Sequence, residues 1–194
     1  MSTTVDYSRY AALLRSGGVL ACPTETLMGL LADALDVEAV ERVRTLKRRP
    51  EGMPIALLVP DLDAVAKVAS HIPEAVRQLA RRHWPGPLTM LVPAAAHVPA
   101  LLVRDGCVGV RVPGASPALE LVRAFGGPLT ATSANLSSEP PVRDADEARA
   151  VFGTALAGVV PGVPPGGEPS TIVDVRCEPP RIVRAGAVTI ELGE

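Results

Sequence analysis

Hydrophobic and polar positions along this chain fall into blocks with two different periods. Short, mostly apolar runs of the length of a strand alternate with longer segments in which apolar residues recur three or four positions apart, as on one face of a helix. The predicted strands are 19–22, 55–59, 88–92, 108–112, 128–131, 172–175 and 181–184. The predicted helices begin at Asp6 and Asp36 and cover 61–68, 73–83, 119–125 and 144–152. This alternation predicts an α/β sheet with helices packed against it.

One segment near the C-terminal end breaks both periods. Residues 161–169 contain four Pro and three Gly. Proline fixes the backbone and removes a donor, and glycine disfavours regular elements, so we expect a loop or lid there.

Composition limits the class of protein. The chain has 194 residues, enough for one medium domain that buries a core without disulfides or metals. The net charge of −2 and the pI near 6.0 argue against a general nucleic-acid binder, although a local basic patch stays open. Of 19 basic residues only Lys47 and Lys67 are lysines.

Cysteine spacing and hydropathy indicate the compartment. The three cysteines, Cys22, Cys107 and Cys177, are an odd number without a CxxC pair, so we expect them to be reduced and mostly buried. No run approaches the roughly 18 apolar residues that a spanning helix needs, and the first residues do not resemble a signal peptide. We therefore expect a cytoplasmic protein that does not contact a membrane.

The common catalytic and nucleotide-binding signatures are absent. There is no GxxxxGK[ST] and no GxGxxG after a strand. The three histidines lie in unrelated contexts, which argues against a zinc site or a histidine-based active site. Ser133 lies in Thr-Ser-Ala-Asn rather than in a G-x-S-x-G turn, which weakens a serine-hydrolase interpretation.

Hydroxyl-rich segments follow three of the predicted strands, at Thr24, Thr132-Ser133 and Ser170-Thr171. Such residues also favour turns and helix N-caps for local reasons, which is the simpler interpretation of any one of them. Isolated cations accompany them: Lys47, Arg49, Arg111 and Arg184. Lys47 and Arg49 suit the C-terminal end of a helix dipole, whereas Arg111 inside a strand must be edge-exposed, paired or ligand-facing.

Ligands of sheet proteins usually lie where strand-end loops meet. Hydroxyl groups and cations with few carboxylates suit a polyanion such as a nucleoside triphosphate, because lysine offers a point charge and arginine a planar fork for phosphate. Two carboxylates, Glu25 and Asp174, either contact a metal or serve as turn or surface residues.

A set of motifs extends this interpretation, and they occur in the order in which a known family has them. They are Pro23-Thr24-Glu25-Thr26 with Gly29-Leu30, Lys47-x-Arg49-Pro50, Trp84-Pro85-Gly86-Pro87-Leu88-Thr89, Val110-Arg111-Val112-Pro113, Thr132-Ser133-Ala134-Asn135-Leu136-Ser137, Pro169-Ser170-Thr171-Ile172-Val173-Asp174 and Ile182-x-Arg184 before Gly186. The chain resembles the YrdC-like threonylcarbamoyl-AMP synthases over nearly its whole length.

The resemblance implies an α/β fold with a twisted mixed sheet, helices packed against it and a concave cationic cavity. It implies an L-threonylcarbamoyladenylate synthase, a nucleotidyltransferase that joins L-threonine, bicarbonate or CO2 and ATP with release of pyrophosphate. The product serves threonylcarbamoyladenosine modification of tRNA through a separate transferase complex, so tRNA and that complex are further expected partners. Longer members of the family carry an additional C-terminal domain. Since this sequence ends at Glu194 without such a domain, we expect residues 1–194 to be a single-domain member.

Site residues carry over position by position. Thr24, Arg111, Thr132 and Ser170 would hold threonine and its carbamate. Lys47, Arg49, Ser133, Asn135 and Arg184 would hold ATP, with Lys47 and Arg49 as the catalytic pair. The carbamate oxygen attacks the α-phosphorus, so positioning and cationic stabilisation supply most of the catalysis and no side-chain nucleophile is needed. Mg2+ is expected to accompany ATP, and no residue is assigned as a metal ligand.

Some positions depart from the family pattern. Met28 stands where the family usually has Tyr or Phe, Ala115-Ser116 replaces a common His-Pro, and Ala185 replaces a frequent Pro. Two alternatives remain besides the synthase. One is a non-catalytic RNA-binding or ribosome-maturation protein with the same surface, and the other is a family member that makes a different carbamoyl adenylate.

Overall fold

The computed structural model describes residues 5–50 and 52–191. Its α-helices are α1 (Tyr7–Arg15), α2 (Val37–Leu46), α3 (Glu74–His83), α4 (Pro117–Phe125) and α5 (Ala145–Phe152). Short 3-10 helices follow at η1 (Asp63–Lys67), η2 (Ala100–Leu102) and η3 (Gly153–Ala155). No helix in these ranges is long and apolar enough to cross a membrane.

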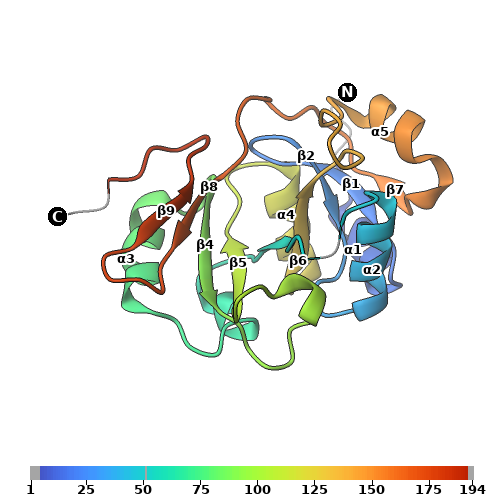
Figure 1. Ribbon diagram of the computed structural model, residues 1–194. Helices are drawn as coiled ribbons and strands as arrows, with labels where there is room; N and C mark the ends of the chain where they lie inside the picture. Colours follow the sequence, from blue (N-terminus) through green and yellow to red (C-terminus); the bar gives the residue numbers. More distant parts are fainter. Residues whose placement is uncertain (1–4, 51, 192–194) are drawn as a thin grey trace.

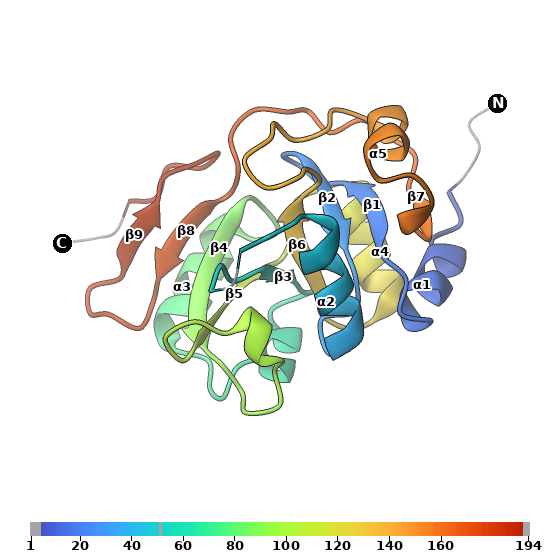
Figure 2. The ribbon, with the colours of Figure 1, turned by 45° about the vertical axis from the view of Figure 1, so that its right-hand side comes forward.

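The strands form one nine-stranded mixed sheet in the order β7-β1-β2-β6-β3-β5-β4-β8-β9. They are β1 (Leu20–Pro23), β2 (Met28–Leu31), β3 (Ala56–Leu58), β4 (Leu88–Pro93), β5 (Cys107–Arg111), β6 (Leu129–Ser133), β7 (Gly158–Val159), β8 (Thr171–Asp174) and β9 (Arg181–Arg184). β3 runs parallel to β5, and β4 runs parallel to β8, whereas β6 lies between β2 and β3 and runs antiparallel to both. Figures 1 and 2 show the sheet turning from β1 to β9, and the predicted twisted mixed α/β sheet is confirmed.

Side-chain caps explain where most helices begin. The carboxylates of Asp6, Asp36 and Asp144 each accept bonds from two backbone amides of the first turn of the helix that follows. The Ser116 hydroxyl does the same for one amide of α4, which ends at Gly126 in the left-handed conformation. These groups satisfy amides that have no partner inside a helix, so the polar residues before each apolar stripe mark the boundaries.

The predicted short helix over 61–68 is present with narrower bounds. Only Asp63–Lys67 is helical, as the 3-10 helix η1, and an Asp61 oxygen accepts a hydrogen bond from the Ala64 amide at 2.8 Å. The segment is too short to repay the nucleation of an α-helix, whereas a 3-10 turn closes with fewer residues.

Two strands are absent from the predictions. β2 follows β1 by a tight antiparallel return in which Pro23 is opposite Met28. The polar residues Glu25 and Thr26 precede this strand. The segment shows neither alternating apolar and polar positions nor a glycine-based turn signal, so the sequence pattern does not indicate a strand. β7 has two residues and pairs in parallel with β1, too short a run for any pattern to detect.

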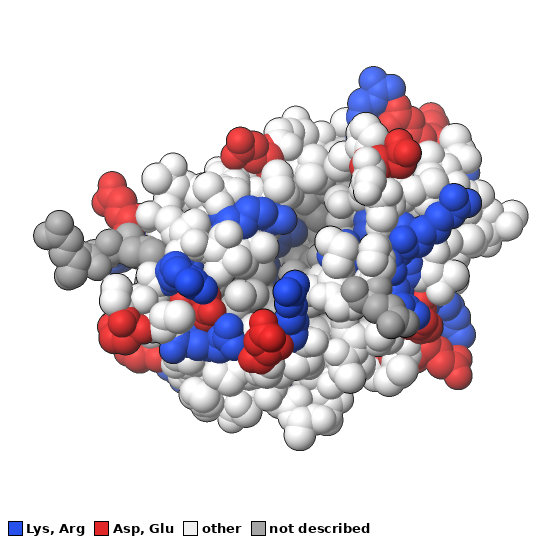
Figure 3. Space-filling model, in the orientation of Figure 1, with Lys and Arg blue, Asp and Glu red and all other residues white. Residues whose placement is uncertain are grey.

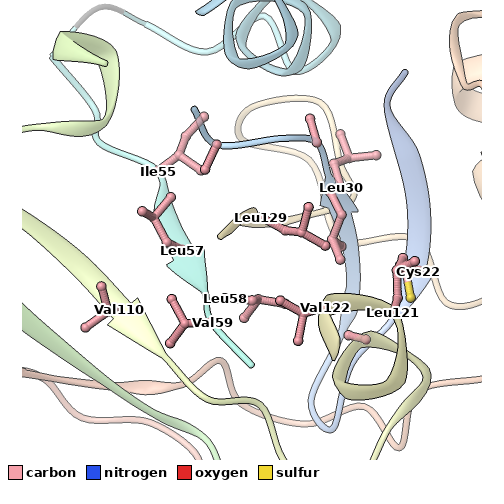
Figure 4. Packing of buried hydrophobic residues seen from close by; sticks show 14 of the residues in the cluster. Cys22, Leu30, Ile55, Leu57, Leu58, Val59, Val110, Leu121, Val122 and Leu129 are labelled. Carbon is pink, nitrogen blue, oxygen red and sulfur yellow. The ribbon is translucent and has the colours of Figure 1, made fainter. Parts of the chain in front are cut away.

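The core is built from Val, Leu and Ala, as the low aromatic content requires. Figure 4 shows Leu57 and Leu58 of β3, Leu129 of β6 and Val122 of α4 among the side chains of the hydrophobic cluster, and all four are fully buried. The α1 helix packs on α4, and α4 contacts β1. The single tryptophan, Trp84, packs against the core and donates from Nε1 to the Leu88 carbonyl at 2.6 Å. It therefore acts as an anchor at the entry to β4.

The connection from β7 to β8 passes over one end of the sheet. Residues 160–170 run from the side of β1 to the side of β8 in both ribbon views (Figures 1 and 2). The predicted loop over 161–169 contains no helix or strand, and most of it is exposed, although Pro164 is buried.

All three cysteines are free. Cys22 and Cys107 are buried, whereas Cys177 is exposed. Burial raises the pKa of the Cys22 thiol well above its usual range, so this thiol stays protonated and behaves as a small apolar side chain.

Candidate active site

A cavity of about 510 Å3 opens between the strands of the sheet and the segment that crosses it. Figure 3 shows a hollow near the centre of this face with basic side chains at its edge. The lining includes most of the polar residues singled out in the sequence: Thr24, Arg49, Arg111, Thr132, Ser133, Ser170 and Arg184. These positions come from separate parts of the chain, and the fold brings them together.

The charge in the cavity wall is all of one sign. Among the described residues, the lining contains Arg49, Arg111 and Arg184 and no aspartate or glutamate. Burial lowers the pKa of Arg49 and of Arg111, because a charge away from water is disfavoured. Arginine starts from so high a pKa that all three remain cations, so the cavity favours an anionic ligand.

Thr24 shapes the loop that joins β1 to β2. Its Oγ1 donates to the Leu27 carbonyl at 2.8 Å and accepts from the amides of Thr26 and Leu27, each at 3.1 Å. The hydroxyl oxygen of Thr26 lies 3.0 Å from Thr24 Oγ1. Thr24 lines the cavity, and its hydroxyl stabilises a local turn. This agrees with the simpler interpretation of the hydroxyl-rich segments, in which such residues favour turns.

The end of β6 carries a compact polar network. Ser133 Oγ donates to Asn135 Oδ1 at 2.6 Å, and Asn135 Nδ2 donates to the carbonyls of Leu136 and Glu139. Ser133 and Thr132 line the cavity, and the Thr132 hydroxyl bonds to no described residue. Asn135 lies outside the main cavity, beside a second one of about 440 Å3 in front of α5.

Lys47 donates hydrogen bonds to this network from a position outside the cavity lining. Its Nζ donates to the carbonyls of Ser133 at 2.5 Å and Asn135 at 3.0 Å, and to Asn135 Oδ1 at 2.7 Å. Lys47 is 1% exposed and is not among the residues that line the cavity. The three protons of its ammonium group match three acceptors, so Lys47 contacts the cavity only through the loop that it holds.

Burial lowers the pKa of Lys47 to about 8, and the nearby Arg49 charge adds to this effect. The local sequence explains why Lys47 is buried while Arg49 lies at the cavity wall. Lys47 is the C-cap of α2, and the chain turns at Arg48, which has a positive φ, before Arg49. Arg49 then donates from Nε and Nη2 to the carbonyls of Met53 and Pro54 at 3.1 and 3.0 Å.

The opposite wall is formed by β4, β8 and β9. Ser170 Oγ lies 2.9 Å from Thr89 Oγ1, and Arg184 Nη2 donates to the Ser170 carbonyl at 2.6 Å. These contacts join three strands at one corner of the cavity. The crossing segment closes the rim, since Gly166 donates its amide to the Thr26 carbonyl at 3.0 Å and Gly167 and Pro169 line the cavity.

Three polar residues have a place at this site that the sequence analysis did not assign, and for Glu25 it is neither the metal contact nor the turn or surface position that the sequence left open. Thr26 and Thr89 line the cavity, and Glu25 forms an ion pair with Arg111. Thr89 could have been found, because it is a polar residue between buried Leu88 and Met90 in β4. Glu25 carries no such signal, since its partner is remote in sequence.

The donor set does not fit a metal held by the protein. The part of the chain that the structure describes has no group of three histidine, cysteine or acidic residues that could hold a metal ion. Asp174 is instead bonded to the guanidinium of Arg176 at 2.8 and 3.0 Å, and Glu25 is paired with Arg111. Protein-held Mg2+ normally takes one or two carboxylates, which this lining does not offer.

Met28 lies in the cavity wall and is fully buried. A flexible thioether at this position supplies neither the ring face of Phe or Tyr nor the hydroxyl of Tyr.

Comparison with known proteins identifies the family. The family model Sua5_yciO_yrdC, described as telomere recombination, matches residues 12–186. The threonylcarbamoyl-AMP synthase of Pyrococcus abyssi is 34% identical over 93% of this chain and 54% of its own length, and that of Halorhodospira halophila is 39% identical over 78% of this chain and 80% of its own length. The chain thus spans about half the length of the first of these relatives.

Solved structures agree with this relationship. The crystal structure of P. abyssi Sua5 complexed with L-threonine superposes with a TM-score of 0.87 at 34% identity, covering 93% of this chain and 54% of that one. A family model that matches most of the chain, similar relatives and the same fold lead to one conclusion: the chain belongs to the Sua5/YciO/YrdC family.

Proposed function

We propose that this chain makes L-threonylcarbamoyl-AMP from L-threonine, bicarbonate or CO2 and ATP, with release of pyrophosphate. The observation that carries the proposal is the cavity of about 510 Å3, lined by three arginines and several hydroxyl groups without a carboxylate, in a member of this family. It suits a triphosphate beside an amino-acid carbamate. The names of the similar relatives and the threonine complex of the P. abyssi protein support the choice of substrates.

The chemistry needs a sheltered anionic site more than a nucleophilic side chain. The threonine nitrogen loses a proton and attacks the carbon of CO2, which gives a carbamate. A carbamate oxygen then attacks the α-phosphorus of ATP, and the bond from that phosphorus to the bridging oxygen of pyrophosphate breaks. Cations that are fixed before the reaction stabilise the charge that spreads over the phosphate oxygens.

The proposed roles follow the two sides of the cavity. Arg111, Thr132 and Ser170 hold threonine and its carbamate, and Thr24 shapes the loop beside them. Arg49, Ser133 and Arg184 hold ATP. Lys47 and Asn135 serve the same ATP site by fixing the loop that presents Ser133, since neither lines the cavity. Mg2+ would enter as part of the ATP substrate, bound to its phosphates.

The crossing segment excludes water from the carbamate, which reverts readily when solvated. Gly167 and Pro169 lie in the cavity wall, and the Gly166 amide ties the segment to Thr26. Such closure also strengthens the electrostatic interactions inside the site. The product would then serve tRNA modification through a separate transferase.

The test measures pyrophosphate release by the purified chain with ATP, Mg2+ and bicarbonate, with and without L-threonine. We expect release only when threonine is present. Arg184→Ala should raise the KM for ATP about tenfold, the effect of about 1.4 kcal/mol that one charge-assisted contact is worth. Arg181→Ala, on the same exposed strand but outside the cavity, is the matched control and should keep the wild-type KM.

Pyrophosphate release that does not depend on threonine would indicate that the chain makes a different carbamoyl adenylate. An absence of turnover with intact ATP binding would overturn the synthase assignment.

A further inference from the structure

Glu25 lies beside Arg111, outside the cavity lining. The Glu25 Oε1 is 3.1 Å from Arg111 Nη1, and their side chains are 11% and 8% exposed. Arg111 lines the cavity, whereas Glu25 does not. A buried guanidinium without a counter-charge is strongly disfavoured, so the two charges depend on each other.

The pair is left incomplete by the rest of the chain. Within the described ranges, Nε of Arg111 and both carboxylate oxygens of Glu25 are buried without a hydrogen-bond partner. The guanidinium of Arg111 donates no hydrogen bond to any residue that the structure describes. Its contact with Glu25 is an ion pair without hydrogen-bond alignment, which leaves the guanidinium donors to be satisfied by an anion that enters the cavity.

The neighbouring backbone fixes the position of Glu25. The turn around it is closed by Thr24 Oγ1, which accepts from the Thr26 amide at 3.1 Å. On its other side is Gly114, where an added Cβ would lie 3.1 Å from Glu25 Cγ and 3.2 Å from Glu25 Cβ. Any larger residue at 114 would press on the Glu25 side chain. These contacts restrict the Cβ and Cγ of Glu25, and its carboxylate lies against the Arg111 guanidinium as a buried counter-charge.

Two other roles for a buried carboxylate do not fit this geometry. A general base must reach the proton that it removes, and Glu25 does not line the cavity in which a substrate amine would lie. A metal ligand needs companion ligands, and the charged partner of Glu25 is itself a cation.

We propose that Glu25 is a positioning residue, which holds the Arg111 guanidinium so that its remaining donors face the carboxylate of the amino-acid substrate. The inference rests on the proposed function, in which Arg111 binds threonine. It assigns Glu25 an effect on threonine affinity and none on ATP affinity.

The test is steady-state kinetics of Glu25→Gln, which keeps the shape of the side chain and removes its charge. We expect the KM for threonine to rise at least tenfold, while the KM for ATP stays within twofold. Glu120→Gln, which removes the carboxylate of an exposed ion pair with Arg123, is the matched control and should leave both constants unchanged. A purely structural role would instead lower the folded fraction or change both KM values together.

A double-mutant cycle with Arg111→Ala separates positioning from general loss of structure. If Glu25 acts through Arg111, Glu25→Gln should change the KM for threonine by less than twofold in the Arg111→Ala background. Should Glu25→Gln fail to fold, Glu25→Asp keeps the charge on a shorter side chain and should raise the KM for threonine two- to tenfold without changing that for ATP.

The outcomes separate the two proposals. An active wild type with an unchanged threonine KM in the folded Glu25 variant, or independent effects in the cycle, overturns the positioning role alone. A wild type that neither turns over nor binds threonine by calorimetry overturns the proposed function and the positioning role with it.

Discussion

Lys47 and Arg49 are two positions apart in the chain, yet only Arg49 lines the cavity. The Lys47 ammonium is a compact group whose three protons meet three acceptors from Ser133 and Asn135. A planar guanidinium could not point donors in those directions, so arginine would not replace lysine there. Arg49 instead spreads its fork along the backbone carbonyls at 53 and 54 and keeps its other face toward the cavity.

The pKa of Lys47 gives a test of this buried position through stability. Its pKa is lowered from 10.5 to about 8 in the folded chain, and the unfolded chain keeps the ordinary value. Between these values the unfolded chain binds more protons, so the free energy of unfolding due to this residue rises with pH across that window and is level below it. Relative to Lys47→Met, the wild type should gain stability as pH rises from about 8 to about 10.

Urea unfolding of both proteins at several pH values measures this difference. A difference in unfolding free energy that stays constant through the window would contradict the lowered pKa. Matched circular dichroism spectra of the two folded proteins are the control for a change in structure.

At the scale of the elements, most boundaries could be predicted because the signals are local. Capping carboxylates and apolar stripes predicted the positions of α1, α2 and α5. Apolar runs predicted the positions of β4, β5 and β8. β2 was missed, because its identity depends on pairing with β1 and β6 rather than on its own alternation. A strand between two others is stabilised by its neighbours, and single-sequence patterns do not contain them.

The segment 161–169 was expected to be a loop or lid, and its contact with Thr26 makes the closing role testable. Gly166 has φ +78 and donates its amide to the Thr26 carbonyl at 3.0 Å. Gly166→Pro removes the donor and cannot adopt this φ. We expect the KM for threonine to rise about fivefold, which corresponds to the roughly 1 kcal/mol of one hydrogen bond.

Glu168→Ala, a change of an exposed residue in the same segment, is the control and should keep the wild-type KM. An unchanged KM in folded Gly166→Pro would mean that this contact does not help to close the site. Limited proteolysis of both variants would report whether the segment has loosened.

At the scale of the whole molecule, charge is concentrated rather than abundant. The net charge is −2, yet the cavity wall has three arginines and no acidic residue among its described members. A cavity of this kind attracts a small polyanion, whereas a nucleic acid needs a broad basic surface. This distribution favours a nucleotide ligand over the RNA-binding alternative. The expectation that residues 1–194 form a single-domain member stays a prediction.

Binding of tRNA tests that distinction directly. We expect the chain without ATP to bind tRNA no more tightly than about 10⁻⁵ M at physiological salt, within the range of non-specific binding. Filter binding over a series of salt concentrations measures the affinity and its slope. Submicromolar binding with a steep salt dependence would favour the non-catalytic RNA-binding protein instead.

The sequence alone determined the fold class, most of the elements and a short set of polar candidates, because periodicity, capping and family motifs are all local properties of the chain. The tertiary structure decided which candidates meet and how each is used. Lys47 and Ser133 are 86 positions apart, and Arg111 finds Glu25 only because β5 ends beside the turn that follows β1. Burial and pairing set the role of a charged side chain, and both depend on neighbours that only the folded chain supplies.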